Sequence, residues 1–326
     1  MSVPTIMELP DFRRRNQWHD ISPGLPSFTS QPVCRFSAEL LTLPNGWNAI
    51  KTERTHDPIL WSTIAITLLL AVTAVAGIFW PATYARETLY SKAGAIASDF
   101  VDLLLVAPVL LISGIKGYRG SVPARLVWLG TLGYLLYNFV LYAFGVHFSP
   151  LFLVYWATLS LCFYATVFSI PFVPLEQIAR ACSPRAPRKT VAIAFLVLAI
   201  PTAAFDLREN VAALVAGQVP PSVIQLGTPV NLVHALDLIF LLPGLCVAAY
   251  LLLRRRASGY ALAPAFLALL ALMDIELAVI VVVMAQMGCF PMIYPMILSF
   301  AVLGVGCAIL LWIYFRLAKK AVWAGQ

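Results

Sequence analysis

The stretch Asp99-Phe-Val-Asp102-Leu-Leu-Leu-Val-Ala-Pro108 decides the fold, because the chain contains this pattern twice. The second copy, 135 residues later, is His234-Ala-Leu-Asp237-Leu-Ile-Phe-Leu-Leu-Pro243. Each copy has an ionisable residue, two apolar residues, an aspartate, five apolar residues and a proline, and each opens a long apolar run. An aspartate inside such a run is costly in lipid and usually faces a protein interior or a wet cavity. The repeated pattern therefore predicts a membrane-spanning architecture and indicates where a functional site should lie.

Composition gives the class of protein. Of the 326 residues, 61% are hydrophobic and 11% are charged, whereas soluble domains carry about 25% charged residues. The apolar residues fall in blocks of about twenty, the length that spans a bilayer core. Eight spans are predicted, at residues 59–80, 96–115, 125–145, 150–172, 190–206, 231–253, 260–285 and 292–315. Pro201 interrupts the fifth span, and the polar run 206–209 is expected to close it.

The basic residues are distributed unevenly between the two sides that eight crossings define. Nineteen of the 22 Lys and Arg residues lie on the side of both termini, and three, Arg86, Lys92 and Arg208, lie on the other. Because cytoplasmic loops carry the excess of Lys and Arg, both termini are predicted to be cytoplasmic. The same placement accounts for the formal net charge of +7, so the lipid bilayer is the expected partner and nucleic acid is not.

Residues 1–58 differ from the rest of the chain. They contain seven prolines and the run Arg13-Arg14-Arg15, and no block of apolar residues long enough to span a membrane. Polar residues follow the arginines, so the segment does not resemble a signal peptide. We expect an irregular cytoplasmic tail over 1–58 and a transmembrane domain over 59–326. The alternative is that residues 38–43 and Trp47 rest on the membrane surface.

The two copies of the opening pattern extend into a wider internal repeat. Arg119-Gly-Ser after the second span resembles Arg256-Ala-Ser after the sixth. Residues 59–180 and 188–318 then form two units of four spans, and an even number of spans makes the repeats parallel. The predicted fold class is all-α, an eight-helix transmembrane bundle of two parallel four-helix repeats with both termini cytoplasmic. The alternative is chance similarity between leucine-rich helices.

Polar residues of several spans are predicted to lie at one depth. With a rise of about 1.5 Å per residue, Asp102 and Asp237 lie about 8–10 Å below the outer interface. The polar residues of the third and seventh spans reach the same outer third from the cytoplasmic side, so we expect an acidic pocket that opens outward. The candidate ligand- or ion-binding residues are Asp102, Asp237, Asp99, His234, Asn138, Asp274, Glu276 and Arg208. Packing or capping roles are the alternative for each acid.

Three of these assignments carry further expectations. Arg208 is the first choice of cation to pair with a carboxylate, with a solvated loop arginine as the alternative. Asp274 and Glu276 are two residues apart, so they cannot both face the same side of a helix. Tyr134 and Tyr137 share one face with Asn138, for which helix packing with internally bonded hydroxyls is the favoured interpretation.

No metal or cofactor is expected. His147, His234 and the acids are ligand types that suit zinc or manganese, but no closely spaced histidine pair supports such a site. The six cysteines form no CxxC pair, so neither a structural zinc site nor a disulfide framework is predicted. The sequence also lacks a phosphate-binding GxxxxGK[ST] loop, an HExxH motif and a GxSxG elbow.

Two segments carry a resemblance. Residues 119–145, which include Tyr137-Asn138, and residues 228–243 resemble stretches of uncharacterised multi-pass bacterial membrane proteins, a family without a known activity. The resemblance covers the second to the seventh span and not the tail. It implies a bacterial integral protein of the inner (plasma) membrane, and it implies no substrate and no catalytic residue.

Three functions are compatible with the sequence. The leading hypothesis is a transporter-like protein for a small polar solute or ion, because parallel repeats that meet at a binding site recur in transporters. The second is a membrane-embedded enzyme acting on a lipid or isoprenoid, with the carboxylates and His234 as acid and base. The third is a sensor or scaffold whose basic tail binds a partner or anionic lipid.

Overall fold

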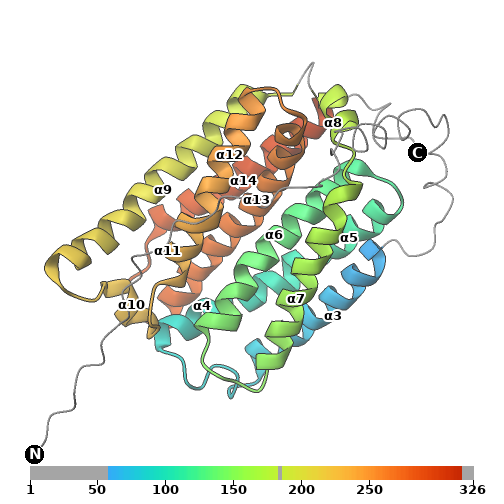
Figure 1. Ribbon diagram of the computed structural model, residues 1–326. Coiled ribbons are helices and arrows are strands. Elements are labelled where there is room, and N and C mark those ends of the chain that lie inside the picture. The colour runs from blue at the N-terminus through green and yellow to red at the C-terminus, as the bar shows by residue number, and fades with distance from the viewer. Residues whose placement is uncertain (1–57, 183–185, 318–326) are drawn as a thin grey trace, which may run out of the picture. The chain divides into compact units, whose positions relative to one another are not determined.

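The computed structural model describes residues 58–182 and 186–317, and within these ranges the chain forms helices joined by short connections, without strands (Figure 1). Six long helices are single elements: α3 (Pro58–Phe79), α6 (Val122–Gly145), α7 (Phe152–Ser169), α9 (Arg188–Ala216), α13 (Ala257–Gln286) and α14 (Tyr294–Leu317). The predicted tail, up to residue 57, lies outside the described residues.

Two further spans are composite. The first of these consists of α4 (Leu89–Val101), the π-helical segment η1 (Asp102–Val106) and α5 (Ala107–Tyr118). The second consists of α11 (Leu232–Leu236), the π-helical segment η3 (Asp237–Leu241) and α12 (Leu242–Leu253). The connections contain the short elements η2 (Ile170–Phe172), α8 (Leu175–Cys182) and α10 (Pro221–Leu226).

The described residues contain eight helical segments long and apolar enough to cross a membrane, which confirms the predicted all-helical bundle of eight spans. Two boundaries were wrong. The second span begins at Leu89 rather than at residue 96, because Thr88 caps the helix by accepting a hydrogen bond from the backbone N–H of Ser91. The fifth span continues to Ala216 instead of closing at 206–209, and Pro201 lies inside the continuous helix.

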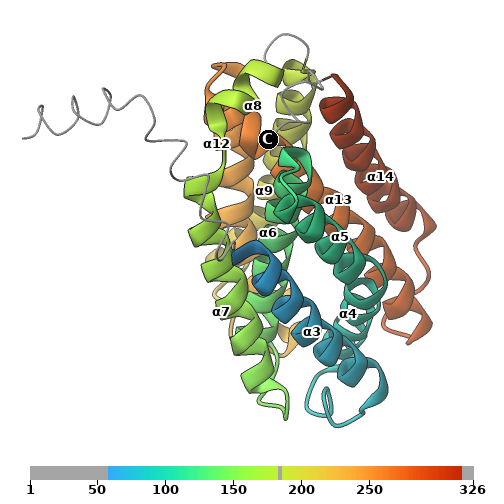
Figure 2. The ribbon, with the colours of Figure 1, turned by 90° about the vertical axis from the view of Figure 1, so that its right-hand side faces the viewer.

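Helices pack in the same order in both halves of the chain. The contacts α3–α5, α5–α6 and α6–α7 are matched by α9–α12, α12–α13 and α13–α14. Figure 2 shows α3 beside α7 in the first half, whereas no comparable contact joins α9 and α14 in the described part of the chain. This order is what a duplication would produce, and the duplication itself stays a prediction.

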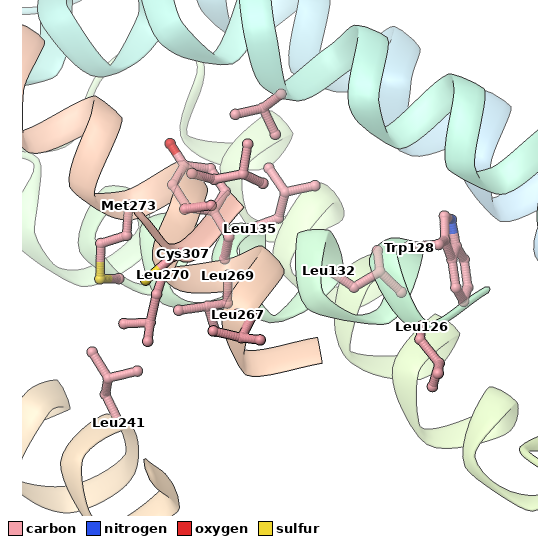
Figure 3. Close-up of a cluster of buried hydrophobic side chains, with 14 of the residues drawn as sticks. Leu126, Trp128, Leu132, Leu135, Leu241, Leu267, Leu269, Leu270, Met273 and Cys307 are labelled. Atoms are coloured by element: carbon pink, nitrogen blue, oxygen red, sulfur yellow. The ribbon is translucent and has the colours of Figure 1, made fainter. Parts of the chain in front are cut away.

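The two halves meet mainly through α6 and α13, with α4 also packed against α13 (Figure 1). In an apolar stretch of 18 residues, 61% of α6 and of α13 is buried, against 11% of α14, so α6 and α13 form the interior of the bundle. Leucines of both helices, Trp128 and Met273 belong to the buried cluster in Figure 3. At Gly130 an added Cβ would lie 2.3 Å from the carbonyl oxygen of Ala265, so only glycine permits this close approach.

Candidate functional site

Asp102 and Asp237 each occupy the first position of a π-helical segment. The N–H of Ala107 donates to the carbonyl of Asp102, five residues back, and the N–H of Leu242 donates to the carbonyl of Asp237 in the same way. A proline follows each of these donors, and proline has no N–H for the carbonyl four residues earlier. The two copies of the repeated pattern therefore share a backbone distortion as well as a sequence. Single π turns within α-helices are frequently found at functional sites.

Asp102 lies in a cluster of buried side chains from both halves of the chain. Its exposed fraction is 0%, and its Oδ1 accepts a hydrogen bond from the Tyr134 hydroxyl at 2.9 Å while Oδ2 accepts from Asn138 Nδ2 at 3.3 Å. The same nitrogen of Asn138 lies 3.4 Å from Oε1 of Glu276 on α13. Ser98 and Tyr134 also contact the Glu276 carboxyl. Asn138 thus links an acid of the second span to an acid of the seventh.

Asp99, one turn before Asp102, is held by two further tyrosines. Its Oδ2 accepts from the Tyr84 hydroxyl at 2.7 Å and its Oδ1 from the Tyr142 hydroxyl at 2.9 Å. Burial, followed by the nearby Asp99 carboxylate, raises the pKa of Tyr84 well above its ordinary value, so this phenol stays a donor. A Cβ at position 77 would lie 1.7 Å from Asp99 Oδ2, so Gly77 of α3 leaves the space that the Asp99 carboxyl occupies.

Among the residues that the structure describes, no basic side chain pairs with Asp99, Asp102 or Glu276. Within residues 58–182 and 186–317, the ion pairs of carboxylates involve only His147 and His234, and none includes Asp99, Asp102 or Glu276. Their donors are the neutral hydroxyl and amide groups of tyrosine and asparagine. We call Asp99, Asp102, Asn138 and Glu276 the acid cluster. An uncompensated carboxylate in a low-dielectric interior is costly, so a proton or a bound cation has to balance the charge of the acid cluster.

Asp237 has its own hydrogen-bond partner on α6, the helix that also carries the partners of Asp102. Its Oδ1 accepts from the Tyr137 hydroxyl at 2.9 Å, and Tyr137 follows Tyr134 by one turn of α6. The face formed by Tyr134, Tyr137 and Asn138 therefore serves both aspartates, and its hydroxyls are bonded internally, as the sequence indicated. Each carboxyl thus has hydrogen-bond partners of its own, and the outward-facing pocket expected between Asp102 and Asp237 stays a prediction.

His234 lies one turn before Asp237 and contacts two acids of α9. Its Nε2 lies 3.4 Å from Asp206 Oδ1 and 3.8 Å from Glu209 Oε2. Its Nδ1 lies 3.1 Å from Asn210 Nδ2, which also donates to the Asp206 carbonyl at 2.8 Å. Since that donation fixes the orientation of the amide, Nδ1 of His234 accepts and the ring proton sits on Nε2, directed at Asp206.

A cavity of about 430 Å³ lies next to His234. It is lined by Asn210, Ala213, Leu214, Gln218, Val219, Pro220, Val223, Pro229, Val230, Asn231, His234, Ala235 and Leu238. His234 is the one titratable side chain among these residues. Neither Asp102 nor Asp237 lines this cavity: Leu238, one residue beyond Asp237, does so, whereas the Asp237 carboxyl is directed at Tyr137 of α6.

Three residues around His234 are not among the candidates predicted from the sequence: Asp206, Glu209 and Asn210. Their polar run predicts the end of a span, whereas α9 continues through it and turns Asp206 and Asn210, one turn apart, toward His234. An acid four residues before an asparagine in an apolar helix is the signal that indicates one buried face.

Arg208 does not take the role expected for it. It is exposed and forms no ion pair with any residue that the structure describes. Two positions along a helix separate it from Asp206, which places it on the other side of α9. His234 is the partner of Asp206 instead.

Asp274 and Glu276 face different helices, as their spacing predicts. Glu276 is directed at Asn138 of α6, whereas Asp274 interacts electrostatically with Cys307 of α14. Asp274 is buried, its Oδ2 has no hydrogen-bond partner in the described part of the chain, and it lies outside the acid cluster.

His147 belongs to another part of the bundle. Its backbone N–H donates to Glu87 Oε1 at 2.7 Å, and its Nδ1 lies 3.1 Å from the same oxygen. Over the described ranges, no group of three or more His, Cys, Asp and Glu side chains has the arrangement of a metal site.

Comparison with protein families, with characterised proteins and with solved structures finds no match for this chain. The resemblance to bacterial multi-pass proteins therefore stays an expectation. The eight apolar helices, with their exposed apolar faces and their interior at α6 and α13, have the features of a protein that sits in lipid. The chain is a multi-pass integral membrane protein.

Proposed function

We propose that the protein is a proton-coupled, transporter-like protein for a small polar solute or ion, and that Asp102 and Glu276 bind the coupling proton. The observation that carries this proposal is the acid cluster, whose carboxyls are buried and form no ion pair with a basic side chain of residues 58–182 and 186–317. Ionisable residues at such positions in membrane bundles mark ion pathways and proton relays.

The amide group of Asn138 links the carboxyls of Asp102 and Glu276. Its amide nitrogen contacts Asp102 at 3.3 Å and Glu276 at 3.4 Å, so the two acids share one donor. Two carboxylates that share a site repel each other when both are charged, and one proton relieves that repulsion. Binding or release of this proton changes the attraction between the second span and α13, and therefore between the two halves.

The backbone supports movement at the same place. The π segments η1 and η3 begin at Asp102 and Asp237, and each is followed by a proline. Helices bend at such positions. A change of charge at Asp102 therefore acts directly on a bendable point of its own helix. Rocking of one half against the other around a central site is the usual transport movement in repeated folds.

Infrared spectroscopy of the protein in liposomes tests the proton site without knowledge of the substrate. When the buffer changes from acidic to alkaline, we expect a carboxylic-acid band to disappear in the wild type, and its amplitude to fall in Asp102→Asn and in Glu276→Gln. Asp274→Asn is the matched control, since it removes a buried acid of the same helix outside the acid cluster. A band that is absent from the wild type, or unchanged in both cluster variants, would refute the proposal.

Transport is tested by adding candidate solutes to the same liposomes loaded with a pH-sensitive dye. A transported solute should drive proton movement in the wild type and in Asp274→Asn, and not in Asp102→Asn. Solute-driven proton movement that continues in Asp102→Asn would show a transporter that is not coupled through this site.

We also propose the predicted orientation, with both termini in the cytoplasm of a bacterial inner membrane. Cys289 lies in the connection between α13 and α14 and is partly exposed. In a variant that keeps only this cysteine, a membrane-impermeant maleimide should label intact cells that have been stripped of their outer barrier. Labelling that requires permeabilisation would reverse the orientation.

A further inference from the structure

We propose that the cavity at His234 binds a small organic cation that has an apolar body and N–H donors, such as a protonated amine or a guanidinium compound. This inference rests on the proposed function, because it names the class of solute for that transport. The binding site itself is argued from contacts that do not involve the acid cluster.

The walls of the cavity are mostly apolar. Nine of its thirteen lining residues are aliphatic or proline, and none of the lining residues is Lys, Arg, Asp or Glu. Its volume of about 430 Å³ lies within the range of about 300–1,000 Å³ that is usual for small-molecule sites. The body of the ligand is therefore apolar, and a few polar side chains determine its head group.

The connection that contains α10 forms one wall of the cavity and lies between the end of α9 and the start of α11 (Figure 1). Ser222 joins it to the second half, since its N–H donates to Glu209 Oε1 at 2.9 Å and its Oγ accepts from Asn231 Nδ2 at 3.0 Å. From the first half, the hydroxyls of Thr88 and Ser91 each donate at 2.8 Å to a backbone carbonyl at the end of α10. Hydrogen bonds from both halves thus hold this wall in place.

Asn210 supplies a hydrogen-bond acceptor in the lining of the cavity. Its Nδ2 is already engaged, at 2.8 Å from the carbonyl of Asp206 and at 3.1 Å from Nδ1 of His234. Its Oδ1 accepts from no group in the described part of the chain. Because an acceptor away from water is costly when it has no donor, a ligand with an N–H group fits here better than one that only accepts.

Two carboxyls next to His234 determine the charge of the site. Nε2 of His234 lies 3.4 Å from Asp206 Oδ1 and 3.8 Å from Glu209 Oε2, so even a doubly protonated ring balances only one of the two acids. Within residues 58–182 and 186–317, neither acid forms an ion pair with Lys or Arg. Negative charge beside an apolar cavity attracts a cation and repels an anion.

Equilibrium binding of three probes to the protein in nanodiscs of zwitterionic lipid tests the class of ligand. Benzylguanidinium is a permanent cation with N–H donors, benzylurea has the same shape and no charge, and phenylacetate is an anion. We expect benzylguanidinium to bind at least about tenfold more tightly than benzylurea, and phenylacetate to show no saturable binding. Isothermal titration calorimetry measures the affinities, with empty nanodiscs as the blank for partition into lipid. Equal affinities of the cation and the urea, or no saturable binding of the cation, would overturn the proposal.

Glu209→Gln separates the charge of the site from its shape. The amide oxygen of the new side chain can still accept from Ser222, so the wall stays in place while one negative charge is removed. The affinity for benzylguanidinium should fall about tenfold, and that for benzylurea should not change. Glu87→Gln is the matched control, because Glu87 pairs with His147 as Glu209 pairs with His234, and it does not line this cavity. Equal affinities in Glu209→Gln and Glu87→Gln would contradict the role of the acids.

Ala213→Phe tests the location of the site. Ala213 is 8% exposed and lines the cavity, so the added ring should occupy the space and abolish binding of benzylguanidinium. Binding that persists in a folded Ala213→Phe variant would place the cation elsewhere, and Glu209→Gln decides if this variant does not fold. Absence of the infrared band from the wild type refutes the proposed function, whereas a normal band with no cation binding refutes this inference alone.

Discussion

Asp102 and Asp237 begin equivalent π segments, yet their carboxyls have different surroundings. Asp102 is fully buried and accepts from both Tyr134 and Asn138, whereas Asp237 is 9% exposed and, of the residues that the structure describes, accepts from Tyr137 alone. The same local structure thus holds one acid with two donors and the other with one.

Asp102→Ala should therefore destabilise the protein more than Asp237→Ala. Truncation at 102 leaves the Tyr134 hydroxyl and the Asn138 amide without their acceptor in a dry interior, at a cost of about 1–3 kcal/mol for each group. Thermal unfolding in detergent micelles should show the lower midpoint for Asp102→Ala. An equal or larger loss in Asp237→Ala would contradict this ranking.

Gly77→Ala should disrupt the contact between α3 and Asp99. The added methyl would lie 1.7 Å from Asp99 Oδ2 and 2.6 Å from its Cγ, so the carboxyl has to leave its tyrosine partners or α3 has to move away. Overpacking of this kind costs about 1–3 kcal/mol. Gly306→Ala on α14 is the control, since a Cβ there meets nothing within 4 Å. The midpoint of unfolding should fall only in Gly77→Ala, and equal midpoints would show that this contact gives way freely.

Thr63→Val should lower stability because it removes the buried hydrogen bond from Trp128, in addition to the bond that Thr63 Oγ1 donates to the Ile59 carbonyl of its own helix. The Nε1–H of Trp128 donates to Thr63 Oγ1 at 2.8 Å, and both side chains are 0% exposed. Valine has nearly the same shape and leaves the indole N–H unpaired, at about 1–3 kcal/mol. Thr67→Val is the matched control, because Thr67 bonds only to the Thr63 carbonyl of its own helix. Chemical denaturation in micelles measures both variants, and a loss in Thr67→Val as large as in Thr63→Val would refute the assignment.

Cys182 should react with alkylating reagents only at high pH. It lies on α8, outside the eight spans, and burial raises the pKa of its thiol to about 11. Since the thiolate reacts, the reactive fraction at pH 8 is about 0.1% and rises about tenfold for each pH unit until the pH reaches the pKa. Mass spectrometry after brief iodoacetamide treatment of the folded protein measures this profile. Unfolded protein is the control, and the profile is contradicted if folded and unfolded chains react equally at pH 8.

The spans were predictable because the bilayer requires long apolar helices. The predicted end of the fifth span was wrong because polar residues stay inside the bundle there. Asp206 looks like a loop residue in isolation, but α9 continues through it and His234 Nε2 of α11 lies 3.4 Å from its Oδ1. That contact joins residues far apart in the sequence, and no local pattern reports it.

The acid cluster was predictable in depth and not in detail. Helical rise alone placed Asp102, Asn138 and Glu276 at one level, and the structure joins these three. Which hydroxyl contacts which carboxyl depends on the rotation of α6 about its axis. Side chains one residue apart point about 100° apart, so a shift of α6 by one residue would change every partner. Tyr134 and Tyr137 therefore had the right face in the sequence but no assigned partner.

The hydrogen bonds of the two aspartates have a consequence for biosynthesis. The ribosome makes the chain from its N-terminus, so Asp102 is made before its hydrogen-bond donors Tyr134 and Asn138. Tyr137, the donor to Asp237, is made before Asp237. Asp102 therefore gains its hydrogen bonds only after α6 has been made, whereas Asp237 can bond at once to an α6 that has already been made. The first half of the protein thus acts as a template on which the second half is inserted.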